Sequence, residues 1–224
     1  MSTLSVVSDF VCPWCFIGKA RLDAALSQLE APPTVQYLPF KLNPTMPPEG
    51  MARADYRRQK FGSMQHSDAL DTQVREAAED SGVTIRHDLM ERTPNTLKAH
   101  MVMAMAASVS PDNKGVPLRL ADALFSAYFT EGRDISLDEV LLELAETSGV
   151  PASVAAAAIK DEELLQATNT LADGLALQGV SGVPTLLLDQ HFLVSGAVPS
   201  QDLVRLIPEA ISTLKKAAQE KATH

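Results

Sequence analysis

Ser8-Asp9-Phe10-Val11-Cys12-Pro13-Trp14-Cys15 contains both cysteines of this 224-residue chain. Residues 4–8, which lead into this stretch, predict a β-strand. The residues that follow Pro13 predict a helix, because their apolar side chains recur at the spacing of one helix face: Leu22, Ala25, Leu26 and Leu29. Cys12 is therefore expected at the junction between a strand and a helix.

The spacing of the two cysteines indicates a redox function. Two cysteines placed at random in a chain of this length would fall three positions apart in about one case in a hundred. Positions three apart share a helix face, so the sulfurs of Cys12 and Cys15 can form and break one bond without backbone movement. We therefore expect a reversible disulfide here.

The helix start gives each residue of Cys12-Pro13-Trp14-Cys15 a role. Unpaired N–H groups and the positive end of the helix dipole favour a thiolate, so we expect Cys12 to be the nucleophile and its pKa to lie below that of a free cysteine. Pro13 suits the first turn because it has no N–H to satisfy. Cys15, one turn inside, is expected to be more buried and to resolve a mixed disulfide. Trp14 brings no charge and offers an apolar platform for a substrate.

A second strand and a long helical segment follow the first helix. Pro32-Pro33 end that helix, and residues 34–38 alternate as a strand, which completes a parallel βαβ unit. From Asn43 a loop rich in proline leads into a long stretch of mostly helical pattern. There we expect helices over 63–81, from Thr93-Pro94 onward, over 117–129, from a Ser136–Glu139 capping box to Gly149, and over 161–178.

Strand patterns return after Gly182. Two apolar runs, 185–188 and 192–195, are separated by Asp189-Gln190, and this spacing predicts a hairpin. A final helix is expected from about Ser200. Pro208 can break this helix, and its polar tail from Lys215 is expected to fray.

The order of elements predicts an α/β thioredoxin fold interrupted by a large all-helical insertion. A βαβ unit comes first, then the helical segment, then a ββα unit, with Cys-x-x-Cys at the first helix and a proline at the third strand. We place the N-terminal βαβ part at 1–50, the helical insertion domain at 51–179 and the C-terminal ββα part at 180–224.

The composition disfavours several classes of partner. Nineteen basic residues against twenty-eight acidic ones give a formal charge of −9, which opposes binding to nucleic acid and to anionic lipid. The first nine residues lack the basic start of a secretory signal, and no apolar run is long enough to cross a membrane. We therefore expect a soluble, cytoplasmic protein with no membrane or nucleic-acid partner. Its oligomeric state stays open.

A zinc site is the main structural alternative for the two cysteines. A tetrahedral zinc would need two further ligands. No pair of the five histidines stands at ligand spacing: His66, His87, His100, His191 and His224. We therefore expect no metal.

Gly182-Val183-Pro184-Thr185 is a second candidate constellation. A proline that opens a strand ordinarily follows a trans bond. In a thioredoxin-like sheet, however, Pro184 would lie beside the Cys-Pro-Trp-Cys turn, and a cis bond would direct the Val183 backbone at a bound substrate. We therefore expect a cis bond, and we include Val183 and Pro184 among the substrate-binding residues.

Residues 8–19 resemble the active-site segment of the FrnE-like branch of the DsbA family. The resemblance extends over nearly the whole chain through further segments: Arg92-Thr93-Pro94-Asn95-Thr96 with Ala99-His100, Ala127-Tyr128-Phe129, Gly132-Arg133-Asp134-Ile135, and residues 179–185. It implies a thioredoxin fold, disulfide oxidoreductase activity and a cis Pro184. The branch also resembles 2-hydroxychromene-2-carboxylate isomerases and kappa-class glutathione transferases, which place a serine at the position of Cys12 and use glutathione.

The same resemblance points to Asn43, Asn95 and His100. It implies that these residues face the cleft between the core and the insertion and bind substrate there. We also include Pro13 and Trp14 of the Cys-Pro-Trp-Cys segment among the substrate-binding residues. Asn43-Pro44 is also an ordinary turn, Asn95 can satisfy a helix end, and His100 can be a hydrogen-bonded core histidine. Both interpretations stay open at the level of sequence.

These observations predict a thiol-disulfide oxidoreductase that acts on protein or small-molecule thiols and disulfides, without a bound cofactor. Two alternatives remain: a glutathione-dependent isomerase or transferase acting on a small molecule, and a redox-sensing or chaperone-like binding protein. Glutathione also stays open as a thiol partner. The direction of exchange depends on small differences in pKa and redox potential, which the sequence does not determine.

Overall fold

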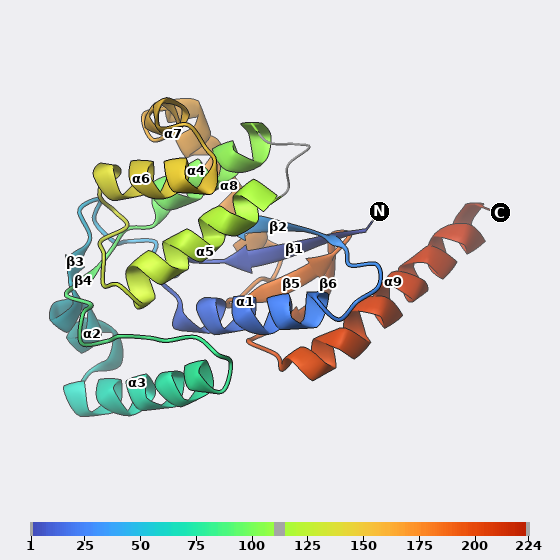
Figure 1. Ribbon diagram of the computed structural model, residues 1–224, viewed down its shortest axis with the longest axis horizontal. Helices are drawn as coiled ribbons and strands as arrows, with labels where there is room; N and C mark the ends of the chain where they lie inside the picture. Colours follow the sequence, from blue (N-terminus) through green and yellow to red (C-terminus); the bar gives the residue numbers. More distant parts are fainter. Residues whose placement is uncertain (1, 110–114, 223–224) are drawn as a thin grey trace.

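A mixed four-stranded sheet forms the centre of the computed structural model, which describes residues 2–109 and 115–222 (Figure 1). Its strands are β1 (Thr3–Ser8), β2 (Thr34–Pro39), β5 (Thr185–Leu188) and β6 (His191–Ser195), in the spatial order β2-β1-β5-β6. β1 runs parallel to β2 and antiparallel to β5, and β5 is antiparallel to β6. The predicted thioredoxin fold is confirmed, and the N-terminal and C-terminal parts meet at the β1–β5 pair.

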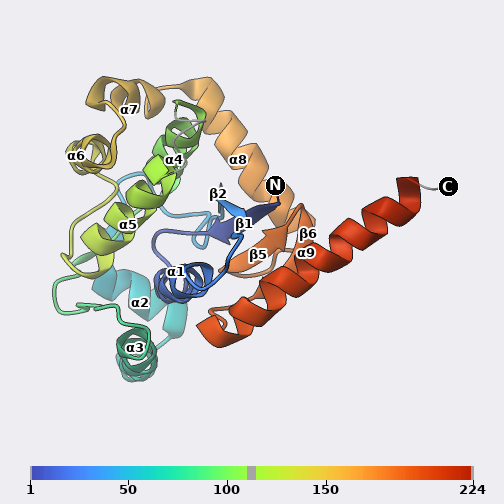
Figure 2. The same ribbon diagram turned by 45° about the vertical axis from the view of Figure 1, so that its right-hand side comes forward.

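The alternation of side chains along β1 explains how the two faces of the sheet are covered. Leu4 and Val6 point to one face, where they pack with helices α1 (Pro13–Leu26) and α9 (Ser200–Ala222). Val7 points to the other face, where it packs with Leu175 of α8 (Glu162–Leu177). Figure 2 shows α1 and α9 side by side on their face of the sheet.

The first helix is shorter than the sequence predicts. It ends at Leu26, and the prediction that it runs to Pro32-Pro33 is wrong. The Ser27 hydroxyl and the Gln28 side-chain amide both donate hydrogen bonds to the carbonyl oxygen of Ala24. These side chains compete with the backbone for a helix carbonyl, so the chain leaves the helix before the prolines.

The insertion between β2 and β5 is mostly helical. Its elements are β3 (Met51–Ala52), α2 (Arg53–Phe61), α3 (Met64–Glu79), β4 (Arg92–Thr93), α4 (Leu97–Val109), α5 (Gly115–Phe129), α6 (Asp138–Ser148), α7 (Ala152–Ala158) and α8. It also holds a small two-stranded sheet, because β3 pairs antiparallel with β4. The insertion is therefore not all-helical.

Two predicted helix starts in the insertion are wrong. Thr93-Pro94 does not open a helix, because Thr93 pairs with Met51 in the small sheet and α4 begins only at Leu97. The capping box also fails: Leu137 occupies the N-cap position of α6 without a side-chain hydrogen bond, and the Ser136 hydroxyl instead donates to Asp134 Oδ1 at 2.6 Å. In contrast, the predicted starts of α3 and α8 are confirmed. The side-chain oxygens of Ser63 and Asp161 cap these helices by accepting backbone N–H groups.

In the C-terminal part the predicted hairpin and final helix are confirmed, whereas the expected break at Pro208 and the expected fraying from Lys215 are wrong. Asp189 and Gln190 both adopt positive φ, at 47° and 68°, which is the backbone conformation of a tight two-residue hairpin between β5 and β6. Helix α9 continues through Pro208 without a break, and it extends to Ala222. Within the described residues, every helix is too short or too polar to cross a membrane.

Aromatic packing joins the insertion to α1. The Phe16 ring stacks on the rings of Phe125 and Phe129 in α5, with centroid distances of 5.6 and 5.7 Å. The same hydrophobic cluster includes Cys12 and Cys15. The dithiol therefore lies against a core to which the insertion contributes, and the domain boundaries at 51 and 179 stay a prediction.

A charged cluster fixes α2 against α3 at the far end of the insertion. Arg57 and Arg53 donate to the two carboxylate oxygens of Asp71 at 2.6 and 2.8 Å, and all three side chains are at most 15% exposed. Burial lowers the pKa of the adjacent His87 to about 4, so this histidine adds no charge near neutral pH. Asp71 is thus the carboxylate that neutralises two largely buried guanidinium groups.

We predict that Asp71→Ala lowers the free energy of unfolding by about 2–3 kcal/mol, because two largely buried cations lose their counter-ion. Denaturant unfolding measures the change. Asp88→Ala is the matched control, since Asp88 also pairs with an arginine, Arg86, but both side chains are about half exposed. The control should leave the unfolding midpoint unchanged. Equal effects of the two substitutions would contradict the structural role of Asp71.

Candidate active site

Cys12 occupies the N-cap of α1, four residues after the end of β1. Its backbone is extended, with φ −91° and ψ 115°, and its N–H donates to the Asp9 carbonyl at 3.0 Å. Its own carbonyl accepts the N–H of Cys15 at 3.0 Å, which begins the helix. Pro13 follows as the first helical residue and needs no hydrogen-bond acceptor. The strand-to-helix junction predicted from the sequence is thus present.

The two cysteines are free thiols that lie near Val183 and Pro184, the residues that lead into β5. Cys12 is 4% exposed and Cys15 is 2% exposed, so both are buried to a similar degree. The Cys12 Sγ lies 3.8 Å from the carbonyl oxygen of Val183. The Val183–Pro184 bond is cis. The structure therefore brings together Cys12, Cys15, Val183 and Pro184 from opposite ends of the chain.

The two thiols differ in acidity because they share one hydrogen bond. The hydrogen bond from the Cys15 thiol lowers the pKa of Cys12, and the N–H groups of Cys15 and Trp14 at the helix start lower it further. Burial raises the pKa of Cys15 well above its usual value, and its hydrogen bond to Cys12 raises it more. Cys12 is therefore the thiol that ionises first, as predicted, although the neighbouring thiol contributes more than the helix start.

Asp9 opposes the ionisation of Cys12. Its side chain is 1% exposed, and its carboxylate raises the pKa of Cys12 through charge repulsion, against the larger effect of Cys15. The carboxylate is held by the N–H of Leu42 at 2.7 Å and, more weakly, by the N–H of Val11 at 3.4 Å. A buried negative charge is thus built into the turn that carries the nucleophile.

His100 lies next to this carboxylate. Its Nε2 is 3.6 Å from Asp9 Oδ1 and has no hydrogen-bond partner among the described residues. The ring packs on Phe10 with a centroid distance of 4.9 Å, and the side chain is only 3% exposed. His100 therefore lies behind the active-site turn rather than in an open cleft.

Asn43, Asn95 and Asp9 line one small cavity of about 60 Å³. The side chain of Asn95 makes two hydrogen bonds within the protein, since it donates to the Met46 carbonyl and accepts the N–H of Leu97 at the start of α4. Asn43 accepts hydrogen bonds from Tyr56 and Lys60, but its Nδ2 is buried and has no partner in the described residues. Asn43 is therefore free to donate to a ligand, whereas Asn95 has a structural role.

Trp14 is the most exposed side chain of the Cys-Pro-Trp-Cys segment, at 39%. It is the single tryptophan of the chain. An indole this exposed can contact a bound molecule without any change in the core.

Sequence reasoning missed two residues that shape the site, Asp9 and Gly18. Asp9 belongs to the segment that carries the cysteines, but no local pattern indicates that Leu42 and His100 enclose it. Gly18 lies on α1 against the Pro184 ring, where an added Cβ would be 2.8 Å from Pro184 Cγ. A glycine inside an otherwise regular helix was the one available signal, because it costs stability unless close packing requires it.

The fold and the dithiol at the start of α1 define a thioredoxin-fold oxidoreductase with a Cys-x-x-Cys site. The model of the DSBA-like thioredoxin domain family matches residues 3–207, so the chain belongs to that family.

Individual relatives agree with this assignment. A probable DsbA oxidoreductase from Streptomyces coelicolor superposes with a TM-score of 0.82 at 26% identity, covering 95% of this chain and 91% of that one. The cytosolic disulfide reductase DsbM from Pseudomonas aeruginosa superposes with a TM-score of 0.60 at 20% identity over 97% and 98% of the two chains. A 2-hydroxychromene-2-carboxylate isomerase gives 0.64 at 15% identity over 97% and 98%. The last two similarities establish the fold alone.

A relative without an assigned activity is similar in sequence. The uncharacterized protein YwbO of Bacillus subtilis is 29% identical over 147 residues. That alignment covers 66% of this chain and 66% of YwbO, just under two thirds of its length.

We predict that Asp9→Asn lowers the pKa of Cys12 further, because it removes the buried charge that opposes the thiolate. The reduced form is thereby stabilised, and the reduction potential of the pair should rise. Ultraviolet absorbance of the thiolate, followed against pH, measures the pKa. Asp68→Asn on the exposed side of α3 is the charge-matched control and should leave the titration unchanged. A higher pKa in Asp9→Asn would exclude this electrostatic role.

We predict that Gly18→Ala slows the reaction of Cys12 with a chromogenic aromatic disulfide several-fold, because the new methyl group displaces the Pro184 ring. Gly174→Ala on α8 is the matched control, since a Cβ there has no neighbour within 4 Å. The control should keep the wild-type rate and gain about 0.5–1 kcal/mol of stability from better helix propensity. Wild-type kinetics in a stabilised Gly18→Ala protein would contradict the packing argument.

Proposed function

We propose that this protein exchanges disulfides with protein or small-molecule thiol substrates through Cys12 and Cys15. The observation that carries the proposal is the division of acidity between the two buried thiols. The hydrogen bond from Cys15 lowers the pKa of Cys12, while burial keeps Cys15 protonated. One sulfur is therefore ready to attack and the other to resolve.

In the reductive direction, the Cys12 thiolate attacks one sulfur of a substrate disulfide. A Cys12–substrate bond forms, the substrate S–S bond breaks, and the second substrate sulfur leaves as a thiolate that takes up a proton. Cys15 then loses its proton and attacks Cys12, which releases the first substrate sulfur and leaves a Cys12–Cys15 disulfide. The substrate gains two electrons and the enzyme dithiol loses two. Oxidation of a substrate dithiol is the reverse sequence.

The backbone around Val183 supplies the substrate-binding edge in this proposal. The Val183 carbonyl lies 3.8 Å from the Cys12 sulfur, so an extended segment paired with this backbone would place its own sulfur close to Cys12. Trp14 and Pro13 form the outer side of the same region, and the unpaired Nδ2 of Asn43 offers a polar contact near Asp9. His100 and Asn95 support the site from behind through their internal contacts.

Glutathione is the small thiol that we propose as a partner. The structure of DsbM, a cytosolic disulfide reductase, has been determined with GSH. That structure superposes on this chain with a TM-score of 0.60 at 18% identity. The isomerase and transferase alternative is less well supported, because this chain carries a second thiol that acidifies the first. A proposed place in the FrnE-like branch rests on the motif similarities around residues 8–19.

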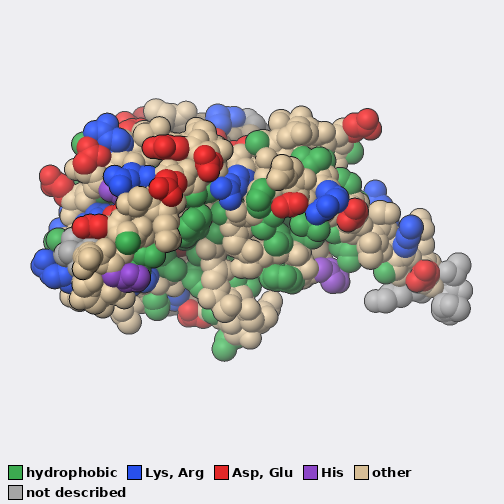
Figure 3. Space-filling model, turned by 90° about the horizontal axis from the view of Figure 1, so that it is seen from below, with side chains coloured by type: hydrophobic (Ala, Val, Ile, Leu, Met, Phe, Trp, Pro, Cys, Tyr) green, Lys and Arg blue, Asp and Glu red, His purple; other side chains and the backbone are tan. Residues whose placement is uncertain are grey.

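We further propose that the protein acts in the cytoplasm, without nucleic-acid or membrane partners. The formal charge of −9 opposes binding to nucleic acid and to anionic lipid, which supports the part of this proposal that concerns partners. Acidic and basic side chains are interspersed on the face shown in Figure 3, and no broad basic area is visible there.

Cys15→Ala should accumulate mixed disulfides on Cys12, because the first bond still forms but the neighbouring thiol that releases it is lost. Multiple turnover in an insulin-reduction assay should fall by about two orders of magnitude or more, since resolution by an external thiol lacks the high effective concentration of Cys15. Non-reducing electrophoresis and mass spectrometry identify the trapped species.

The variant that lacks both cysteines is the control and should trap nothing. Full glutathione-dependent turnover of a small electrophile by Cys15→Ala, without a trapped species, would favour the isomerase or transferase instead. A wild-type protein that forms the disulfide once but does not turn over would favour a redox sensor.

A further inference from the structure

Resolution of a mixed disulfide on Cys12 requires Cys15 to become a thiolate inside the protein. Cys15 is 2% exposed, and burial raises its pKa well above the usual value. In the mixed disulfide Cys12 carries no charge, so its effect on Cys15 is absent, but the effect of burial remains. A thiolate at this depth is favourable only with hydrogen-bond donors from the protein.

The hydroxyl group of Ser8 is buried and has no hydrogen-bond partner. Ser8 is the last residue of β1 and is 1% exposed, and its Oγ is unpaired among the residues that the structure describes. Ser5, the other serine of this strand, differs in this respect, because its Oγ accepts the side-chain amide of Gln36 at 2.7 Å. An unpaired hydroxyl at this depth is unfavourable, and a hydrogen bond formed in another state of the site would account for it.

The position of Ser8 directs this hydroxyl toward Cys15. Side chains alternate along β1, so Ser8 shares the face of Leu4 and Val6, on which α1 packs. With the neutral thiol the hydroxyl makes no hydrogen bond of good geometry. Against the larger effect of burial, however, the Ser8 hydroxyl and the N–H of Asp9 each lower the pKa of Cys15. Two donors, one from a side chain and one from the backbone, therefore converge on the Cys15 sulfur.

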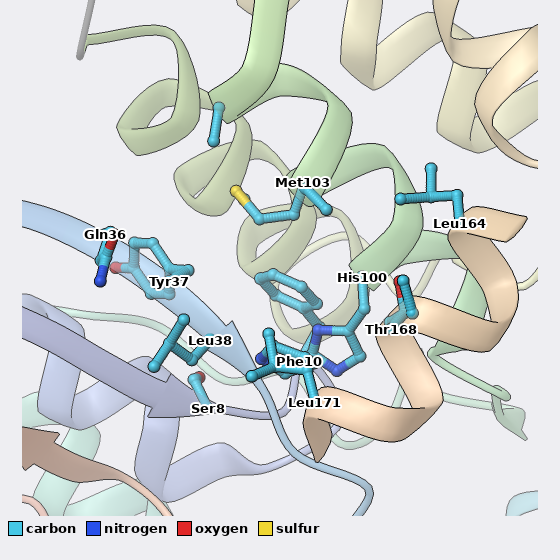
Figure 4. Close-up of a pocket in the computed structure, with 14 residues that line it drawn as sticks. Ser8, Phe10, Gln36, Tyr37, Leu38, His100, Met103, Leu164, Thr168 and Leu171 are labelled. Atoms are coloured by element: carbon cyan, nitrogen blue, oxygen red, sulfur yellow. The ribbon is translucent and has the colours of Figure 1, made fainter. Parts of the chain in front are cut away.

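Ser8 also borders a cavity of about 250 Å³ between β2, α4 and α8. Figure 4 shows its side chain next to Leu38 of β2, at the edge of this space. The lining is mostly apolar, and the polar side chains of Gln36, His100 and Thr168 also reach it. A hydroxyl that borders a cavity on one side has room to turn toward a sulfur that becomes charged.

We propose, on the basis of the redox function proposed above, that the Ser8 hydroxyl and the Asp9 N–H together stabilise the Cys15 thiolate and thereby speed resolution of the mixed disulfide. A thiolate is a stronger acceptor than a neutral thiol, so the hydroxyl stabilises the attacking form more than the resting form. Only interactions that are stronger in the transition state than in the ground state raise the rate. Ser8 is therefore a further catalytic residue of the dithiol.

Ser8 keeps its own proton throughout the step. Cys15 gives its proton to solvent, and its sulfur attacks the Cys12 sulfur. A Cys12–Cys15 bond forms, the bond from Cys12 to the substrate breaks, and the substrate sulfur leaves with the electron pair and takes up a proton. Over both steps the dithiol loses two electrons and the substrate disulfide gains two. Ser8 thus acts as a hydrogen-bond donor and not as a base.

The other titratable groups around Cys15 do not obscure the effect of Ser8. Cys12 is bonded to the substrate during resolution and carries no charge. Burial and nearby carboxylates raise the pKa of Tyr37 on β2 well above its usual value, so its phenol stays neutral near neutral pH. Asp9 is the same residue in the wild type and in every Ser8 variant. A change in the pH profile of resolution therefore reports on Cys15.

Dithiobis-nitrobenzoate, a symmetric chromogenic disulfide, separates the two steps. Attack by Cys12 releases a first coloured thiolate at a rate that depends on reagent concentration, and resolution by Cys15 releases a second at a rate that does not. Ser8→Ala should leave the first phase within about twofold of the wild type and slow the second about 3- to 10-fold at neutral pH. The variant should need a higher pH to reach the wild-type rate of resolution.

This magnitude follows from two opposing effects on Cys15. A hydrogen bond to a charged group changes an equilibrium by roughly 10- to 100-fold, so its loss lowers the thiolate fraction by that factor. A more basic thiolate is also a better nucleophile, which offsets about half of the loss on a logarithmic scale.

Ser5→Ala is the matched control, since Ser5 is a buried serine of the same strand whose hydroxyl already has a partner in Gln36. Both phases should keep their wild-type rates. Ser8→Thr and Ser8→Val form a second pair that is nearly equal in shape and differs in the hydroxyl group, and this pair replaces Ser8→Ala if that variant does not fold. The threonine variant should resolve about 3- to 10-fold faster than the valine variant.

The outcomes separate the role of Ser8 from the redox function. Release of a single thiolate equivalent by the wild type would mean that Cys15 does not resolve, and the proposed function would fail together with this inference. Release of both equivalents by the wild type, with an unchanged second phase in Ser8→Ala, would overturn the role of Ser8 alone. Equal slowing of both phases would overturn it too, because that result indicates a distorted turn, and so would equal resolution by the threonine and valine variants.

Discussion

The first two turns of α1 are held from three sides, and the geometry of the dithiol depends on those contacts. Phe16 stacks on Phe125 and Phe129 of α5, Gly18 allows the Pro184 ring to touch the helix, and the buried Lys19 pairs with Asp122 of α5. The contacts of Phe16 and Lys19 are with α5 of the insertion, and the contact of Gly18 is with Pro184, which directly precedes β5. The insertion therefore positions the same helix start that the sheet carries.

Within this frame, the acidity of Cys12 results from opposing effects that act over short distances. The Cys15 thiol and the N–H groups at the helix start favour the thiolate, whereas burial and the Asp9 carboxylate oppose it. Small shifts in thiol pKa change both the nucleophilicity of the thiol and its redox potential. A buried acid next to Cys12 therefore changes both properties of the dithiol. The same acid joins the dithiol to His100 and Phe10, so the active-site turn has the dithiol on one side and the cavity between β2, α4 and α8 on the other.

The part of the site that the sequence predicted is the part that local pattern encodes. The cysteine spacing, Pro13 at the first helical position and the strand pattern of β1 are all within fifteen residues of one another. The interpretation of Asn43, Asn95 and His100 as a single group of substrate contacts needed spatial information. Asn95 is occupied by Met46 and Leu97, and His100 faces a different cavity from Asn43.

The sequence by itself determined the order of the major elements, the hairpin at Asp189-Gln190 and the redox pair, because periodicity, turn residues and close spacing act between near neighbours. Only the tertiary structure decided the features that depend on distant partners. Thr93 becomes a strand residue because it meets Met51, and Asp9 becomes an enclosed charge because Leu42 and His100 close around it. These pairings join segments more than thirty residues apart, where burial and hydrogen bonding across the fold outweigh local preference.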